Sequence, residues 1–487
     1  RGLRISGGHK VKELLLAYLK IWPSERRVRC VDKLGWHGSV YVTPKETVGA
    51  NGDELTVFQS DAPLMPATGC AGTLEKWRET VGAWSAGNSR AVFSISCAAA
   101  GPLLALAGAE GGGFHFRGGT STGKTTLLHV AASVFGPPAE AVRSWRTTSN
   151  ALEGLAAMHN DGLLVLDELS QIDPDHAAEA AYMLANGHAK SRANRFGQPR
   201  KTTTWRLLFL SSGEESLAAL MRQTRRRPNP GQELRLADLP AEAGADMGVF
   251  EELHEHESPA ALALAIKDAA TKFHGTVGRE WLAVVVKNRT ALAEQLPERI
   301  REFCTDHVPL EAAGQVERVA RRFALVAAAG KLLTTYGLTA WPEGMAEQSA
   351  AHCFRDWLAN YGGGPRESLN VKKQVRLFFE MHGDSRFEPV DGGDDSRRVT
   401  INRAGFWRLK QSGDREFLVL RETFREEVCE GIDHTHAVKV LKESGWLLPD
   451  PDGRHNTQQV RLPGITKKTR CYVIGSKLWE GGGDDAI

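Results

Sequence analysis

The sequence lacks the features that mark several classes of protein. It has no uninterrupted apolar run of the roughly 20 residues that a membrane helix needs; the nearest run, residues 91–109, contains Ser94, Ser96 and a Gly101-Pro102 pair, and predicts a buried helix. The 7 cysteines include no C-x-x-C pair, which suits reduced thiols in a cytoplasmic protein. Against 61 basic residues stand 59 acidic ones, so net charge points to neither a nucleic-acid nor a membrane partner. We therefore expect a cytoplasmic protein with no membrane partner.

Composition and length indicate a globular chain of several domains. Hydrophobic residues make up 41% and charged residues 25% of the 487 residues, which excludes a mainly disordered, collagenous or coiled-coil chain. At roughly 150 residues per domain, the length predicts about three domains. The first residue is Arg1 rather than Met, and we therefore expect the chain to be a fragment of a longer protein.

Residues 118–125, with the sequence Gly-Gly-Thr-Ser-Thr-Gly-Lys-Thr, match the P-loop pattern G-x-x-x-x-G-K-[ST]. A short strand is predicted before the motif and a helix after it. In this setting the glycines let backbone N–H groups converge on phosphate oxygens, Lys124 neutralises the β- and γ-phosphates, and the Thr125 hydroxyl binds Mg²⁺. We therefore predict ATP and Mg²⁺ as the ligands, and the binding residues Gly118, Gly119, Thr120, Ser121, Thr122, Gly123, Lys124, Thr125 and Thr126.

A pair of carboxylates follows the apolar run of residues 163–166. The run predicts a buried central strand, which would carry Asp167 and Glu168 to the carboxyl edge of the sheet, where ligands bind. Asp167 would hold Mg²⁺ through its water shell, and Glu168 would polarise the attacking water. The sequence therefore predicts a catalytic acid pair beside the P-loop.

Two further positions resemble those of AAA+ ATPases. Ser211 and Ser212 follow the next predicted strand, where a polar residue, usually Asn in AAA+ proteins, contacts the γ-phosphate and the lytic water. Arg235 precedes another short apolar run, where AAA+ proteins carry the arginine finger that completes a neighbouring subunit's site. The alternatives for Arg235 are a surface arginine or a finger within residues 225–227.

A basic segment lies between these motifs. Residues 187–206 contain six Lys or Arg residues and no Asp or Glu, and a turn flanked by β-prone residues predicts a hairpin with a basic tip. In ring helicases of the AAA+ class a hairpin at this place projects into the pore, where cations hold phosphates and an aromatic ring stacks on a base. The alternative is a solvated face. The predicted DNA-binding residues are Lys190, Arg192, Arg195, Phe196, Arg200 and Lys201.

Several motifs, taken together, resemble the domain-of-unknown-function 927 (DUF927) family over roughly residues 30–345. They are the P-loop, residues 131–136, 211–214 and 231–236, and the N-terminal segments 35–38 and 87–90. Its members are helicase-like ATPases of phages, plasmids and integrative elements, sometimes fused to primase domains. The resemblance implies a replicative helicase or helicase-primase component of a mobile element. We therefore expect an ATP-dependent DNA helicase or translocase that acts on single-stranded or forked DNA, with a primase or initiator protein as a possible partner. Because an arginine finger works between subunits, the expected assembly is a hexameric ring.

These observations predict the fold class α/β. The domain boundaries follow from changes in pattern along the chain. We expect a small α+β module over 1–88, an AAA+ P-loop NTPase core with a parallel sheet and helices on both faces over 89–258, an α-helical lid over 259–360, and a winged-helix-like domain over 361–487.

Some assignments stay open at this point. Arg318, Arg321 or Arg322 would contact the γ-phosphate from the lid, or all three would be lid surface. The helix with Lys439 and Lys442 would enter a DNA major groove, or its domain would dock a protein. The whole chain could instead be a non-unwinding AAA+ switch or defence ATPase that acts on a protein partner, which needs no basic hairpin. A monomeric P-loop kinase is disfavoured because it needs no arginine from a neighbour.

Overall fold

The chain divides into two compact units, Arg1–Trp357 and Leu358–Ile487. The computed structural model describes residues 9–21, 27–50, 54–60, 66–190, 202–223, 234–310, 312, 314–361, 365–391, 400–410, 413–430, 432, 434–453 and 455–479. The finer division into four modules stays a prediction.

A five-stranded sheet forms the centre of the first unit, with the strand order β10-β6-β9-β8-β7. Every pairing in it is parallel, so all its strands end at the same edge. Both β8 and β9 are nearly continuous apolar runs, as expected for strands that are covered on both faces. The predicted α/β fold with a parallel sheet is therefore confirmed. The bounds are β6 Gly112–Arg117, β7 Val142–Ser144, β8 Gly162–Asp167, β9 Leu207–Gly213 and β10 Leu236–Pro240.

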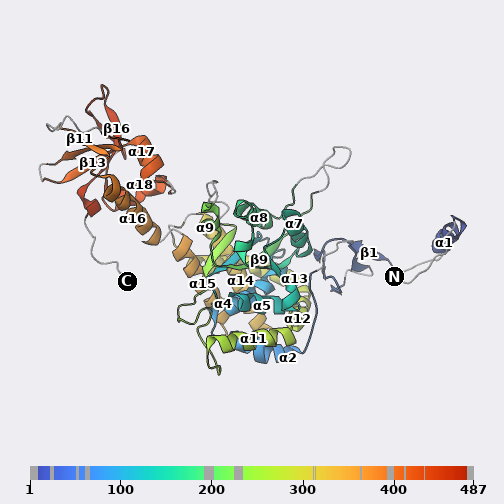
Figure 1. The fold of residues 1–487 in the computed structure, drawn as a ribbon. Helices are drawn as coiled ribbons and strands as arrows, with labels where there is room; N and C mark the ends of the chain where they lie inside the picture. The colour runs from blue at the N-terminus through green and yellow to red at the C-terminus, as the bar shows by residue number, and fades with distance from the viewer. Residues whose placement is uncertain are drawn as a thin grey trace. The chain divides into compact units, whose positions relative to one another are not determined.

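Helices cover both faces of this sheet (Figure 1). Helices α4 (Ser89–Ala100) and α5 (Lys124–Ser133) contact β8 and β9 on one face. The other face packs against α7 (Ser149–Met158), α8 (Pro174–Asn186) and α9 (Leu217–Arg222). Every residue of α4 is buried, which confirms the buried helix predicted at the start of residues 91–109.

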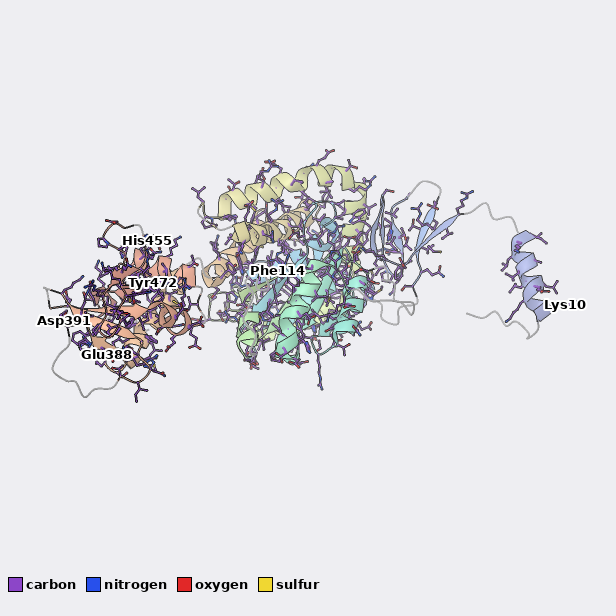
Figure 2. All side chains as sticks on the ribbon, turned by 90° about the horizontal axis from the view of Figure 1, so that it is seen from above. Lys10, Phe114, Glu388, Asp391, His455 and Tyr472 are labelled. Atoms are coloured by element: carbon purple, nitrogen blue, oxygen red, sulfur yellow. The ribbon has the colours of Figure 1, made fainter. Side chains whose placement is uncertain are left out.

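In the described residues between 259 and 361, five helices follow the sheet, as the pattern over 259–360 predicts. They are α11 (Pro259–Lys272), α12 (Thr276–Lys287), α13 (Arg289–His307), α14 (Gly314–Thr335) and α15 (Met345–Tyr361). Aromatic rings join them to the sheet. Phe93 of α4 lies edge-on to Phe114 of β6, labelled in Figure 2, with ring centres 4.9 Å apart. The ring centre of Phe323 of α14 lies 4.9 Å from that of Phe114 and 5.4 Å from that of Phe354 of α15. The helical layer and the sheet thus share one core.

The N-terminal part of this unit contains small sheets and short helices. Its elements are α1 (His9–Ile21), β1 (Val28–Val31) paired with β5 (Leu55–Phe58), the antiparallel strands β2 (Gly35–His37), β3 (Val40–Val42) and β4 (Thr47–Val48), and the helices α2 (Leu74–Trp77) and α3 (Ala83–Ser85). A π-helical turn, Arg78–Gly82, joins α2 to α3. The Tyr41 hydroxyl donates to the Asp161 carbonyl at 2.7 Å, which ties the antiparallel sheet to the loop before β8.

The second unit packs helices on a mixed sheet of order β11-β12-β13-β16-β14, with β15 also on β16. Phe424 stacks on Tyr472, labelled in Figure 2, with ring centres 4.1 Å apart. Strand β13 is followed by a short α-helix, which a π-helical turn, Phe424–Val428, continues. The bounds are α16 Pro365–His382, β11 Phe387–Pro389, β12 Gly405–Leu409, β13 Arg415–Leu420, α17 Arg421–Thr423, α18 His434–Glu443, β14 Leu447–Leu448, β15 Gln458–Val460 and β16 Thr469–Ile474.

Among the helices that the structure describes, none combines the length and the apolar character that crossing a lipid bilayer demands.

Candidate active site

The loop of residues 118–123 connects the carboxyl end of β6 to the first residue of α5. The Gly118 N–H donates to the Gly213 carbonyl at the end of β9, at 3.2 Å. Gly123 has φ +97°, and a Cβ there would lie 2.6 Å from the Val249 side chain, so both backbone conformation and space require glycine. Ser121 also has a positive φ of 63°. This tight turn places the loop at the N-terminus of α5. The free backbone N–H groups at such a helix end can bind an anion.

The Lys124 side chain is buried and folds back over the loop. Its ammonium donates to the carbonyls of Gly118 at 2.8 Å and Gly119 at 2.6 Å. The Thr120 hydroxyl donates to the Glu214 carboxylate at 2.6 Å, and this bond links the loop to the segment after β9. A cation and a helix N-terminus therefore meet at one place.

The threonines of the motif differ in their surroundings. The Thr122 hydroxyl donates to the Gly119 carbonyl at 3.0 Å. Thr125 is half-buried and Thr126 is buried at the first turn of α5. Helix α5 contacts β8, the strand that ends in Asp167.

Asp167 and Glu168 stand at the carboxyl end of β8, and the Ser212 hydroxyl joins them. This hydroxyl donates to the Asp167 carboxylate and accepts the Glu168 N–H at 3.3 Å. The Ser170 hydroxyl donates to the Glu168 carboxylate at 2.6 Å. Glu168 has φ +58°, a conformation that costs roughly 1–3 kcal/mol and persists only where its surroundings enforce it. The hydroxyl of Ser212 thus binds the Asp167 carboxylate and the backbone of Glu168, and Ser170 binds the Glu168 carboxylate.

Ser211 faces the opposite side of the sheet, although both serines were candidates for contacting phosphate. Strand β9 continues through Gly213, beyond its predicted end at residue 210, so adjacent side chains point to opposite faces. The Ser211 hydroxyl lies 2.9 Å from His115 Nδ1 and accepts the Trp145 indole N–H at 2.8 Å. Burial lowers the pKa of His115. The structure brings Ser212, and not Ser211, to the acid pair.

Arg235 lies at the other edge of the sheet. Its carbonyl accepts the Gly113 N–H at 2.8 Å, beside the start of β6 and far from that strand's carboxyl end. Its guanidinium lies 3.7 Å from the Glu110 carboxylate and 5.6 Å from the centre of the Tyr182 ring. The structure therefore does not place Arg235 with the loop of its own chain. The rival residues 225–227 lie outside the described residues.

The helical-layer arginines also gather at this far edge. Arg322 is buried and donates to the carbonyls of Leu234 and of Arg235, the latter at 3.1 Å. Burial lowers its pKa to about 10, with nearby Arg235 as the next cause. Arg318 lies 3.9 Å from the Glu110 carboxylate. With Arg321 these residues line a cavity of about 560 Å³. None of the three arginines reaches the loop of its own chain.

The described part of the basic segment is the base of a hairpin. The Ala189 N–H donates to the Thr203 carbonyl at 3.0 Å. Acidic groups from other elements bind two of its cations: Lys190 Nζ lies 2.8 Å from Glu179, and Arg206 Nε lies 3.0 Å from Asp161. The other predicted DNA-binding residues, Arg192, Arg195, Phe196, Arg200 and Lys201, lie outside the described residues.

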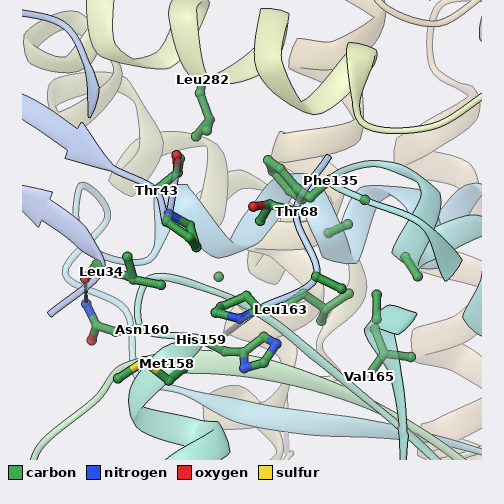
Figure 3. Close-up of a pocket in the computed structure, with 18 of the residues that line it drawn as sticks. Leu34, Thr43, Thr68, Phe135, Met158, His159, Asn160, Leu163, Val165 and Leu282 are labelled. Atoms are coloured by element: carbon green, nitrogen blue, oxygen red, sulfur yellow. Dashed lines mark hydrogen bonds between the residues drawn. The ribbon is translucent and has the colours of Figure 1, made fainter. Parts of the chain in front are cut away.

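An apolar cavity of about 100 Å³ lies away from this site, at the other end of α5 (Figure 3). Asn160 in its wall donates to the Leu34 carbonyl at 2.9 Å, and His159 and Met158 face it (Figure 3). Its wall includes residues of the segment 131–136 but none of the predicted nucleotide-binding, catalytic or DNA-binding residues.

Comparisons with known proteins agree with this fold. Residues 1–204 match a family model described as "Domain of unknown function (DUF927)". A solved structure titled "SCCmec type IV Cch - active helicase" is similar, with a TM-score of 0.63 and 19% identity over 96% of this chain and 82% of that one. The apo C-terminal region of NrS-1 has a TM-score of only 0.25 at 10% identity, over 72% of this chain and 85% of that one. No curated protein matches the sequence.

The family match covers part of the predicted span of residues 30–345. The motifs at 211–214 and 231–236 lie beyond the matched residues. Within the matched part lie the P-loop motif, the acid pair and the segment 87–90. The resemblance predicted from the motifs is thereby confirmed: residues 1–204 of this chain match the DUF927 family, and the chain has a fold similar to that of a solved helicase structure.

Proposed function

We propose that the chain is a Mg²⁺-dependent ATPase of the AAA+ class. The observation that carries the proposal is the meeting, at one edge of the parallel sheet, of the P-loop motif and of an acid pair held by Ser212. Ligands of such sheets bind outside the carboxyl ends of the strands. The backbone N–H groups of residues 119–124 would bind the phosphates, and the Lys124 ammonium would exchange its loop carbonyls for phosphate oxygens.

The residues also fit a magnesium ion. Thr125 opens α5, which contacts the strand ending in Asp167, and hydroxyl and carboxylate oxygens are the ligands that Mg²⁺ prefers. When bound, the ion neutralises charge on the phosphate oxygens. Asp167, with its Ser212 hydrogen bond, would hold the ion, and Glu168 would orient and polarise the attacking water. The left-handed backbone of Glu168 is consistent with a carboxylate held in one direction for that task.

The ATPase would work as an oligomer, with a hexameric ring as the expected form. Arg235 lies at the sheet edge opposite its own loop, so it would act as an arginine finger for the nucleotide of a neighbouring copy. The similarity in fold to a solved helicase supports DNA as the track. We propose a helicase or translocase of a mobile element that moves single-stranded DNA through a pore lined by the basic hairpin, with a winged-helix-like domain in the second unit.

Two variants test the hydrolytic core. Lys124→Ala should abolish nucleotide binding, because the main phosphate-neutralising charge is lost. Glu168→Gln should bind ATP with nearly normal affinity and turn it over slowly, because only the water-orienting carboxylate changes. Binding of a fluorescent ATP analogue and steady-state phosphate release measure the two effects. Normal turnover by Glu168→Gln would show that another residue activates the water.

A specific observation keeps a second function open. Glu179 and Asp161 pair with Lys190 and Arg206, so these two cations of the basic segment are already balanced, as in a solvated face. A non-unwinding switch ATPase that acts on a protein partner would need nothing more from the hairpin. Replacing Arg195, Arg200 and Lys201 together by Ala decides between the two functions. A translocase loses DNA-stimulated hydrolysis and unwinding and keeps basal hydrolysis, whereas a switch shows no unwinding with or without the change and keeps its rate of hydrolysis.

A further inference from the structure

The chain that follows strand β10 packs against the nucleotide loop. Residues 240–252, which begin at the last residue of β10 and otherwise belong to no named helix or strand, are called the brace. The Ala241 N–H donates to the Arg117 carbonyl at 2.7 Å, and the Val249 N–H donates to the Thr122 carbonyl at 3.0 Å. A Cβ on Gly248 would lie 2.4 Å from that same carbonyl oxygen. The brace therefore touches the loop directly, at the residues that shape its turn.

The brace is held by the segment of residues 87–90, which the proposed function leaves without a role. Asn88 is fully buried, and its amide oxygen accepts the N–H groups of Glu251 at 2.8 Å and Glu252 at 3.0 Å. Its amide nitrogen donates to the carbonyls of Glu252 and Trp84, both at 3.0 Å. The side chain of Asn88 thus makes four hydrogen bonds, and three of them hold the end of the brace. Gly87 completes the fit, since a Cβ there would lie 2.2 Å from the Glu252 carboxylate.

Arg90 holds the other end of the brace. Its side chain is 1% exposed and donates to the carbonyls of Pro240 at 3.2 Å and Glu242 at 3.1 Å. The same guanidinium forms an ion pair with Asp356 of α15. The planar fork of arginine suits such simultaneous bonds to two carbonyls and a carboxylate. The brace is therefore fixed at both ends by neighbouring residues at the start of α4.

Helix α15 reaches the brace by a second route. His352 lies between two carboxylates, with Nδ1 3.3 Å from Glu251 and Nε2 3.4 Å from Asp356. The Ser89 N–H donates to the same Glu251 carboxylate. A shift of α15 against α4 would therefore move the brace, and with it the backbone at Thr122.

We propose that residues 87–90 are positioning residues for the nucleotide loop: they fix the brace, the brace fixes the backbone of Thr122 and Gly123, and α15 is coupled to the loop through Asp356 and His352. The inference rests on the proposed function in so far as the ligand of the loop is ATP. It assigns to the segment 87–90 a mechanical role that neither the fold nor the family match specifies.

Asn88→Ala tests the proposal. It should weaken binding of a fluorescent ATP analogue by about tenfold, a size typical of coupling between sites, and should speed amide hydrogen exchange of residues 118–126 in the nucleotide-free protein. Ser94→Ala is the matched control, because Ser94 is buried on the same helix and its hydroxyl donates to the Arg90 carbonyl within that helix. It should change neither quantity.

The outcomes separate this proposal from the proposed function. Unchanged affinity and unchanged exchange in folded Asn88→Ala would overturn the positioning role, and so would equal effects in the Ser94→Ala control. Faster exchange in a chain whose wild type binds no nucleotide would support positioning and reject the ATPase. Should Asn88→Ala fail to fold, His352→Ala carries the test. It removes a partly exposed ring that bridges brace and α15, and it should weaken nucleotide binding by about threefold; unchanged affinity would overturn the coupling.

Discussion

Replacing Ser212 by Ala should slow ATP hydrolysis far more than it destabilises the fold. The variant removes the hydroxyl that donates to Asp167 and accepts the Glu168 N–H. A hydrogen bond to a charged group contributes about 1.5–3 kcal/mol. Each 1.36 kcal/mol in a barrier changes a rate about tenfold, so losing this bond where charge develops should lower kcat by roughly tenfold to 100-fold. Steady-state phosphate release at saturating ATP measures the loss.

The adjacent residue provides the matched control. Ser211→Ala removes a hydroxyl of the same size from the same strand, but on the other face of the sheet. His115 Nε2 donates to the Glu215 carbonyl at 3.0 Å, so Nδ1 accepts from Ser211, and the variant leaves that nitrogen and the Trp145 N–H without their partner. At about 1–3 kcal/mol for each of the two unpaired buried groups, the free energy of unfolding should fall by roughly 2–6 kcal/mol while kcat stays near its normal value.

Comparing the two variants separates an effect on the acid pair from a general loosening of β9. If Ser212→Ala hydrolyses ATP at the normal rate, the hydroxyl does not orient the acids during turnover. If both variants lose kcat equally, the effect comes from general loosening of β9 and not from the acid pair. Urea unfolding of each variant separates these cases. Ser212→Ala should show the larger loss of kcat, and Ser211→Ala the larger loss in the free energy of unfolding.

Three further predictions concern other parts of the first unit. Mixing Arg235→Ala with Lys124→Ala chains should restore hydrolysis at about a quarter of the interfaces, where an intact loop meets an intact finger; an unchanged rate in Arg235→Ala alone would reject the finger. Arg322→Ala should lower the free energy of unfolding by about 2–4 kcal/mol, because the carbonyls of Leu234 and Arg235 lose a buried donor, and thermal unfolding checks this. Burial lowers the pKa of His159 to about 4, below its ordinary value of about 6.5, so the unfolded chain binds the proton first as pH falls. Between pH 6.5 and pH 4, the free energy of unfolding should therefore fall by about 3 kcal/mol more in wild type than in His159→Gln. Denaturant titrations at both pH values measure this. An equal fall in the two proteins would show that His159 is charged in the folded chain.

Local patterns predict the parts of the fold that local physics determines. The glycines and lysine of residues 118–124 and the apolar run ending at Asp167 are short stretches whose chemistry and geometry depend on near neighbours. The parallel sheet follows from alternating apolar strands and helices for the same reason. The end of β9 could not be placed, because serine is found in strands and loops alike, and its pairing with β6 through Gly213 decides the matter.

Contacts between distant residues could not be predicted from one sequence. Asn88 and Glu252 are 164 positions apart, and no spacing rule connects them. The same holds for Trp145 with Ser211 and for Arg322 with the carbonyl of Arg235. For the segment 87–90 the sequence offers one signal, a glycine followed by three polar residues before an apolar helix, but this pattern also describes an ordinary helix start. The contacts of Asn88 and Arg90 with the brace can be seen only in the folded chain.

If Arg235 completes the site of a neighbouring copy, its position at the sheet edge opposite the loop constrains how copies can share a site. The six residues of β6 span about 20 Å at 3.3 Å per residue. Two copies related by a twofold axis would have to bury the whole length of β6 in their interface to complete two sites at once. A head-to-tail contact completes one site. It leaves an unused arginine at one end of the pair and an incomplete nucleotide loop at the other. An open row of copies then always has one working site fewer than it has chains. Closure into the proposed ring would remove the idle site, so the rate per chain should rise with concentration until the ring closes and stay constant thereafter.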